Sequence, residues 1–198
     1  MSSNSPPGLL DSSYVDQKAS PPIDNPAWIA DVLQALKAGY DRPAATAALI
    51  GGVTKFTQYA AEWGPFYAQD IYDPAVYDPA DRERVIIAHF SATSQMYPMA
   101  IHIWWGMVEG LPFDDVTRTF LITGSYAGIW SFTQSCGLFQ EWVAFMAALW
   151  IGCKVAGAQD VPWLVALTAM NLRFNQMQPT ALAVTGAVAF GVQQKLIP

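Results

Sequence analysis

Helix signals recur along this sequence, and the alternating pattern typical of β-strands does not occur in it. The clearest helix start lies at Asp78, whose side chain can cap the first turn. Pro79 suits the first helical position, and Asp81 adds a negative charge that the helix dipole favours. These helix signals, without a strand pattern beside them, predict an all-α fold.

One proline divides the helix that starts at Pro79. Pro98 removes a backbone donor and clashes with the preceding turn, so the segment must kink or divide around Tyr97 before it continues to Val108. Glycine and proline mark the bounds of other helices, with Gly39 and Gly110 at helix ends and Pro43 and Pro112 at helix starts. We expect these other helices over residues 26–39, 43–63, 112 onward, 132–153, 161–176 and 180–195. Residues 67–77 read as a loop because they carry an Asp-Pro step and are followed by another.

The chain contains one domain and an N-terminal arm. Its 198 residues suffice for one domain with a sizeable core, and no change in composition divides residues 26–198. Residues 1–25 are rich in Ser, Pro and Asp and have few large apolar side chains, so we expect a flexible arm.

The charge content indicates which partners to expect. Charged residues make up 13% of the chain and apolar residues 53%, which favours self-association. The net charge of −6 offers no basic surface for nucleic acid. The longest apolar run, from Trp142 to Cys153, is too short to span a membrane, so no membrane partner is expected. Because no basic and apolar leader is visible at the N-terminus, we expect a cytoplasmic protein.

The cysteine and histidine patterns argue against a redox or metal centre. Cys136 and Cys153 fit neither a CxxC motif nor a paired metal-ligand motif, so we expect two buried, reduced thiols. The two histidines, His89 and His102, lack the helical spacing of a zinc site. We therefore expect no metal and no cofactor.

A set of short motifs between Asp78 and Gly128 carries a resemblance to a known family. The motifs are Arg82-Glu83-Arg84 at a helix start, His102 on the next helix, Gly110, Asp114-Asp115 and Tyr126-Ala127-Gly128. Their order and spacing resemble the carboxymuconolactone decarboxylase and alkylhydroperoxidase D (AhpD-like) superfamily. Phe56-Thr57-Gln58 and Trp63-Gly64 are similar to its decarboxylase branch. The resemblance implies an all-α AhpD-like domain that assembles as a homotrimer or hexamer.

The resemblance also distinguishes two chemistries. In the peroxidase branch it implies a CxxC motif whose positions here are Gln95 and Pro98, and neither residue can form a thiolate. In the decarboxylase branch it implies a cofactor-independent lyase, which needs no cysteine. That branch usually has an acid where Pro98 stands, so the resemblance does not identify the substrate.

Glu83 and His102 are the candidate catalytic residues. The apolar neighbours of His102 favour a neutral imidazole, and a neutral histidine beside a carboxylate is a usable acid-base group. The alternatives are that His102 is a core residue bonded to a carbonyl and that Glu83 only complements the helix dipole.

Five further residues are candidates for substrate binding. Arg82 and Arg84 could hold a carboxylate, although adjacent helical positions cannot both face the pocket of Glu83, and at least one could instead form a surface ion pair. Trp63, Tyr126 and Trp105 are candidate pocket walls, with packing as the alternative.

These residues favour a lyase or isomerase that uses Glu/His proton transfer on a small, partly apolar carboxylic acid, lactone or β-keto acid. Two rivals remain open. Cys136 could support reduction of peroxides, or the chain could be an oligomeric binding protein that lost its chemistry.

Overall fold

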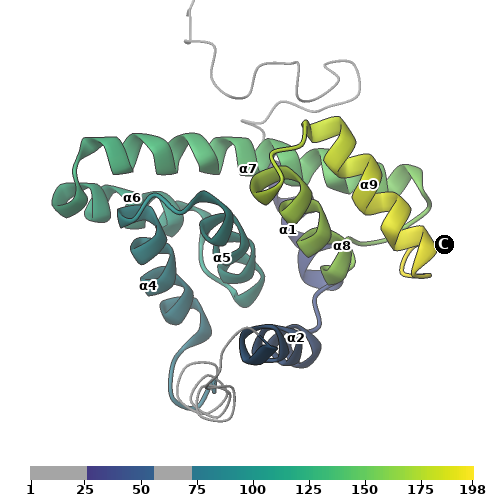
Figure 1. Cartoon of the computed structure of the whole chain (residues 1–198), viewed down its shortest axis with the longest axis horizontal. Coiled ribbons are helices and arrows are strands. Elements are labelled where there is room, and N and C mark those ends of the chain that lie inside the picture. The colour runs from purple at the N-terminus through teal and green to yellow at the C-terminus, as the bar shows by residue number, and fades with distance from the viewer. Residues whose placement is uncertain (1–25, 56–72) are drawn as a thin grey trace, which may run out of the picture.

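The computed structural model describes residues 26–55 and 73–198, and these residues are helical throughout apart from short turns. Figure 1 shows the arrangement of the helices, with no strand in the part of the chain that is described. The predicted all-α class is therefore confirmed.

The described helices fall close to the predicted ranges. Their bounds are α1 Pro26–Ala38, α2 Arg42–Lys55, α4 Pro79–Ala92, α5 Met96–Glu109, α6 Phe113–Ala127, α7 Ile129–Val155, α8 Trp163–Met170 and α9 Thr180–Gln193. The remainder of the helix expected over 43–63, most of the loop expected over 67–77, and the arm expected over 1–25 lie outside the described residues. A π-helical turn, Asn171–Asn175, follows α8 and was not predicted.

The predicted division between α4 and α5 exists, but it lies before Tyr97 rather than around it. Helix α4 ends at Ala92, and Ser94 then takes a left-handed conformation with φ of 56°. Helix α5 begins at Met96, which places Pro98 in its first turn. The first four backbone N–H groups of a helix have no partner within it, so a proline there costs no hydrogen bond.

Helix α7 is the longest element, and every other described helix except α2 packs against it (Figure 1). Helices α4, α5 and α6 lie against its first half in this view, and α8 and α9 lie against its second half. Among the described residues it is the one helix long and apolar enough to cross a membrane. Since 56% of its most apolar window is buried by the other helices, it has the character of a core helix.

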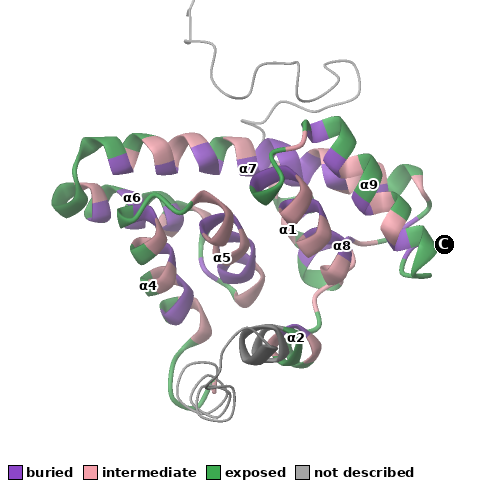
Figure 2. Ribbon diagram, viewed as in Figure 1, coloured by how far each residue is buried: buried purple, intermediate pink, exposed green. Residues whose placement is uncertain are grey.

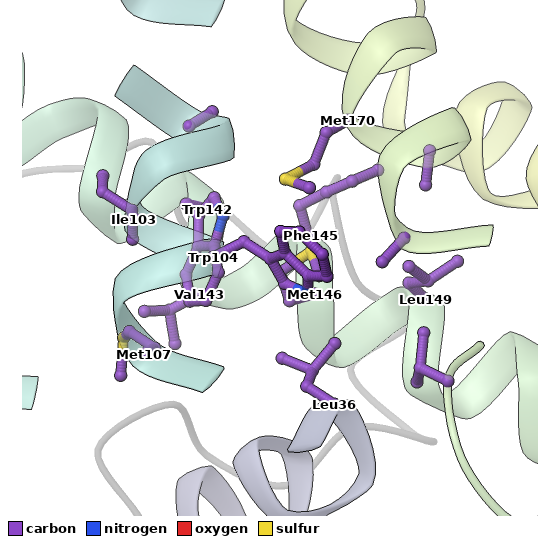
Figure 3. Close-up of a cluster of buried hydrophobic side chains, with 14 of the residues drawn as sticks. Leu36, Ile103, Trp104, Met107, Trp142, Val143, Phe145, Met146, Leu149 and Met170 are labelled. Carbon is purple, nitrogen blue, oxygen red and sulfur yellow. The ribbon is translucent and has the colours of Figure 1, made fainter. Parts of the chain in front are cut away.

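The core lies where α1, α5, α7 and α8 meet (Figure 3). Trp104 of α5 and Trp142 and Phe145 of α7 are among its largest fully buried side chains. Leu36 of α1 and Met170 of α8 close the cluster from the other elements. Figure 2 shows that buried and exposed residues alternate along helices such as α4, α7 and α9. Burial of such side chains supplies most of the stabilisation of the fold.

Two polar contacts fix α4 against α7 inside this core. The hydroxyls of Ser91 and Ser135 lie 2.8 Å apart, and the Ser131 hydroxyl donates to the Ser91 carbonyl over 2.7 Å. The Ser91 carbonyl also accepts from the Ser94 backbone N–H at 3.2 Å, so the Ser131 hydroxyl adds a second bond to it. These bonds fix the C-terminal end of α4 relative to α7.

The cap of α4 provides a test of the fold. Asp78 accepts hydrogen bonds from the backbone N–H groups of Ala80 and Asp81 at 3.0 and 3.1 Å. We expect Asp78→Ala to lower the free energy of unfolding by about 1 kcal/mol, because these donors lose their acceptor. Asp78→Ser is the matched control and should keep most of the stability. Urea unfolding followed by circular dichroism measures both, and equal stability of Asp78→Ala and the wild type would contradict the role of this cap.

Candidate active site

Helices α4 and α5 bring Glu83 and His102 into direct contact. The Glu83 Oε2 atom lies 2.7 Å from His102 Nδ1, across the break between the two helices. Glu83 is fully buried, and the His102 side chain is 12% exposed. The contact predicted from the sequence is therefore present, and the alternative in which a backbone carbonyl satisfies His102 Nδ1 is not.

Arg82 completes a buried cluster with this pair. Its Nε atom donates to Glu83 Oε1 over 2.8 Å, and its side chain is 6% exposed. Each oxygen of the Glu83 carboxylate therefore has a partner. A buried carboxylate requires such compensation, because desolvation of an unpaired charge is very unfavourable.

The Glu83 contact determines which nitrogen of His102 can react. A carboxylate oxygen accepts a hydrogen bond, so Nδ1 carries the proton and Nε2 is left as the acceptor of the neutral ring. Phe90 and Trp105 neighbour the imidazole, with centroid distances of 5.3 and 6.2 Å. The ring therefore has two aromatic neighbours, and Nε2 is the nitrogen that the Glu83 contact leaves available.

Gly106 allows the two helices to come this close. A Cβ atom at this position would lie 3.1 Å from the Glu83 Cβ atom and 3.0 Å from a methyl group of Leu111. Both distances are shorter than ordinary van der Waals contact, so a larger residue would push α5 away from α4. The separation of Glu83 from His102 therefore depends on this glycine.

A second carboxylate, which the sequence analysis missed, lies beside Trp105. Glu109 Oε1 accepts hydrogen bonds from Tyr40 Oη at 2.6 Å and Arg42 Nε at 2.9 Å. The Trp105 indole approaches the same oxygen at 3.4 Å, and the Glu109 side chain is 1% exposed. Burial and the Glu109 charge raise the pKa of Tyr40, so its hydroxyl remains a donor.

A signal for this cluster exists in the sequence. Glu109 lies in the last turn of its helix, where the dipole disfavours an acid, so a compensating cation is required. Arg42 is that cation, and Tyr40 and Trp105 complete the set of donors. The cluster holds the indole of Trp105, which stacks on His102. Glu109, Tyr40 and Arg42 therefore help to position a neighbour of the imidazole.

The remaining predicted site residues do not join the cluster. Arg84 pairs with Asp81 and, over 3.0 Å, with Asp115, which is the surface ion pairing that the sequence left open. Tyr126 is 90% exposed near the end of α6, and His89 is exposed on α4. Trp63 lies outside the described residues. The substrate-binding roles of Arg84, Tyr126 and Trp63 stay predictions.

Both cysteines are free thiols, but only one is buried as expected. Cys153 is buried, whereas Cys136 is half-buried on α7 because it lies toward the less covered first half of that helix. Burial raises the pKa of Cys136, and burial together with the Asp160 charge raises the pKa of Cys153 to about 12. A raised thiol pKa keeps the neutral form at pH 7, so neither sulfur is an activated nucleophile.

The described part of the chain contains no group of three metal-ligating side chains. An open cleft of about 280 Å³ in this part of the chain lies between α1 and the end of α7, away from Glu83 and His102. Its lining includes Asp31, Trp150 and Lys154. A histidine that a carboxylate orients can transfer a proton, which is what the arrangement of Glu83 and His102 can do chemically.

The comparisons with known proteins identify no relative. No family model matches the sequence, and no match was found among curated proteins or solved structures. The resemblance to the carboxymuconolactone decarboxylase and AhpD-like superfamily therefore rests on the motifs alone and stays a prediction.

The thiol environments provide a test of this description. We expect Cys153 to stay unmodified by iodoacetamide at pH 8 in the native protein, because its raised pKa and its burial both suppress the reactive thiolate. Cys136 should react slowly, and its rate should rise as the pH increases past 9. Mass spectrometry of the intact protein measures the modification, with the urea-unfolded chain as control. Fast modification of either thiol at pH 7 would contradict the assignment.

Proposed function

We propose that this protein is a cofactor-independent lyase or isomerase of the decarboxylase-like branch of the AhpD-like superfamily. It would act on a small, partly apolar carboxylic acid, lactone or β-keto acid. The observation that carries the proposal is the 2.7 Å contact between buried Glu83 and His102 Nδ1. A carboxylate, an imidazole and a guanidinium in one buried cluster are suited to move one proton.

Glu83 would orient His102 and stabilise its charged form. When Nε2 accepts a proton, the ring becomes an imidazolium, and the adjacent carboxylate compensates the positive charge. Arg82 prevents Glu83 from turning away, because it holds the second carboxylate oxygen. In this arrangement Glu83 and His102 act as one proton-handling unit, with Nε2 as the exchanging atom.

In the decarboxylation reaction the bond between the carboxylate carbon and the neighbouring carbon breaks. Its electron pair forms an enolate while carbon dioxide leaves, and the Nε2 proton of the imidazolium then moves to the enolate carbon. In an isomerisation, neutral Nε2 would take a proton from one carbon and return it to another. Both reactions require the same two residues and no redox cofactor.

The surroundings of His102 favour a partly apolar substrate. Phe90 and Trp105 provide flat apolar surfaces beside the ring. A guanidinium can hold a substrate carboxylate in two hydrogen bonds. Arg82 is the candidate nearer to His102, because it contacts Glu83, whereas Arg84 lies with Asp81 and Asp115.

The rival peroxidase chemistry has less support. It needs a nucleophilic thiolate, and burial raises the pKa of Cys136.

We further propose that the protein is cytoplasmic. We also propose that it self-associates, in keeping with its apolar composition.

Hydrogen exchange at carbon would test the proposal directly. The full chain is incubated in D₂O with a panel of β-keto acids and lactone carboxylic acids, and mass spectrometry measures deuterium bound to product carbon. Decarboxylation places a solvent deuteron on the product carbon, and so does an isomerisation in which the His102 proton exchanges with solvent. The assay therefore detects either reaction. Incorporation above the buffer rate that disappears in His102→Ala is the expected result. Equal incorporation by the wild type and His102→Ala would overturn the assignment of His102.

With an active substrate, we expect His102→Ala and Glu83→Gln each to lower turnover by about 10² or more, the usual size of a general acid-base contribution. Glutamine can still accept the Nδ1 hydrogen bond but cannot compensate the imidazolium. The double variant should be scarcely slower than the slower single variant, because members of one unit are not additive. Initial rates measure these effects, and circular dichroism verifies that the fold is kept.

His89→Ala is the matched control, because it removes an exposed histidine from the same region. Cys136→Ser should also keep full activity. Loss of activity in Cys136→Ser together with full activity in His102→Ala would favour the peroxidase hypothesis instead. Formation of sulfenic acid at Cys136 after addition of a hydroperoxide would agree with that result.

A further inference from the structure

Five large apolar side chains are exposed where α6 turns into α7, and we refer to them as the corner patch. Its members are Leu121, Ile122, Tyr126, Ile129 and Trp130, with exposed fractions of 59, 63, 90, 75 and 69%. Figure 2 shows the exposed residues at this corner of the molecule. Gly128, with φ of 98°, makes the turn that brings the start of α7 next to the end of α6.

The corner patch is not a part of the core that failed to pack. Helix α6 already buries its inner face through Val116, Phe120 and Thr123. Ile122 and Tyr126 are four residues apart, so they lie side by side on the opposite, outer face. The helix is therefore apolar on two faces, and only one of them has a partner in the described part of this chain.

The area of the corner patch corresponds to that of an interface. Tyrosine and tryptophan each offer roughly 150–250 Å² of surface. With the three aliphatic side chains, the corner patch presents on the order of 600 Å², which is at the upper end for the largest patch of a monomer. A stable pair of proteins buries about 800 Å² on each side, so the corner patch would supply most of one side of such an interface.

The charges at the corner patch favour a second copy of the chain over an acidic membrane surface. Anionic lipid would repel a chain of net charge −6. A second copy carries the same net charge, but no Asp or Glu lies between Leu121 and Trp130, so pairing of the corner patch buries no carboxylate. The nearest charged side chain of α6 is Arg118, which is 72% exposed and bonds to Asp115 of its own helix over 3.0 Å, and the exposed Asp114 lies one turn further from the corner patch.

We propose that the corner patch pairs with the same patch of a second copy of this chain about a two-fold axis near Ile122. Around such an axis the two α6 helices run antiparallel. Arg118 lies four residues before Ile122, and Tyr126 lies four residues after it, so Arg118 of one copy faces Tyr126 of the partner subunit. A guanidinium over a tyrosine ring is a favourable contact, and it fixes the register of the pair.

This surface goes beyond the proposed chemistry and does not depend on it. It is also compatible with the trimers that the family resemblance implies, because two-fold contacts join two trimers into a hexamer.

Sedimentation equilibrium of the full chain would test the proposal. We expect a multimer with an even number of copies at micromolar concentration, and at least a tenfold weaker association, with half the mass, for Ile122→Arg. Val155→Arg is the matched control, because Val155 is 85% exposed at the other end of α7 and should leave the mass unchanged. A monomeric wild type, or an unchanged mass of Ile122→Arg, would overturn the proposal. Binding of a monomeric wild type to phosphatidylcholine vesicles would indicate a lipid surface instead.

A cross-link tests the two-fold axis itself. A residue at the axis meets its own counterpart, so Ile122→Cys should form a disulfide-linked dimer under mild oxidation, whereas Val155→Cys and the wild type should not. A multimeric Ile122→Cys variant without this cross-link would overturn the proposed axis. Circular dichroism verifies that each variant keeps the wild-type fold.

Discussion

The need to compensate one buried carboxylate organises helices α4 and α5. Glu83 is fully buried, and its two oxygens bind Arg82 and His102. Loss of Arg82 would leave the carboxylate without its cation in a medium of low polarity, which costs several kcal/mol. The break before α5, the glycine at position 106 and the aromatic neighbours of His102 together place the imidazole where the carboxylate requires it. The same contacts that stabilise this part of the fold therefore define the geometry of the candidate site.

Local signals in the sequence predict the helices well. Asp78 with Pro79 and Pro112 before Phe113 place two helix starts correctly, because capping and proline geometry act within one turn. The meeting of Glu83 and His102 was predicted from the motifs. The Glu109 cluster was not, since Tyr40 and Arg42 precede it by 69 and 67 residues and spacing alone cannot bring them together. The Tyr-Ala-Gly motif gave no indication that Tyr126 is almost fully exposed.

The apolar residues of the chain lie in two separate places in the structure. Many of them surround α7, where side chains from several helices form the core. Others lie on the outer face of α6 and at the start of α7, where the described chain does not cover them. A composition value cannot distinguish these two uses, because buried and exposed apolar residues contribute equally to it. Only the positions of the residues on their helices separate a core from a surface that binds a partner.

The contact between two helices also bears on how the protein responds to heat. Glu83 and His102 belong to different helices, and their separation depends on close packing at Gly106 rather than on the backbone of either helix. A shift of about 1 Å between reacting groups can lower a rate a hundredfold. Warming that loosens the α4 and α5 contact by this amount need not melt either helix. Under the proposed function, proton transfer at His102 would then slow before the fold is lost, and it would recover on cooling.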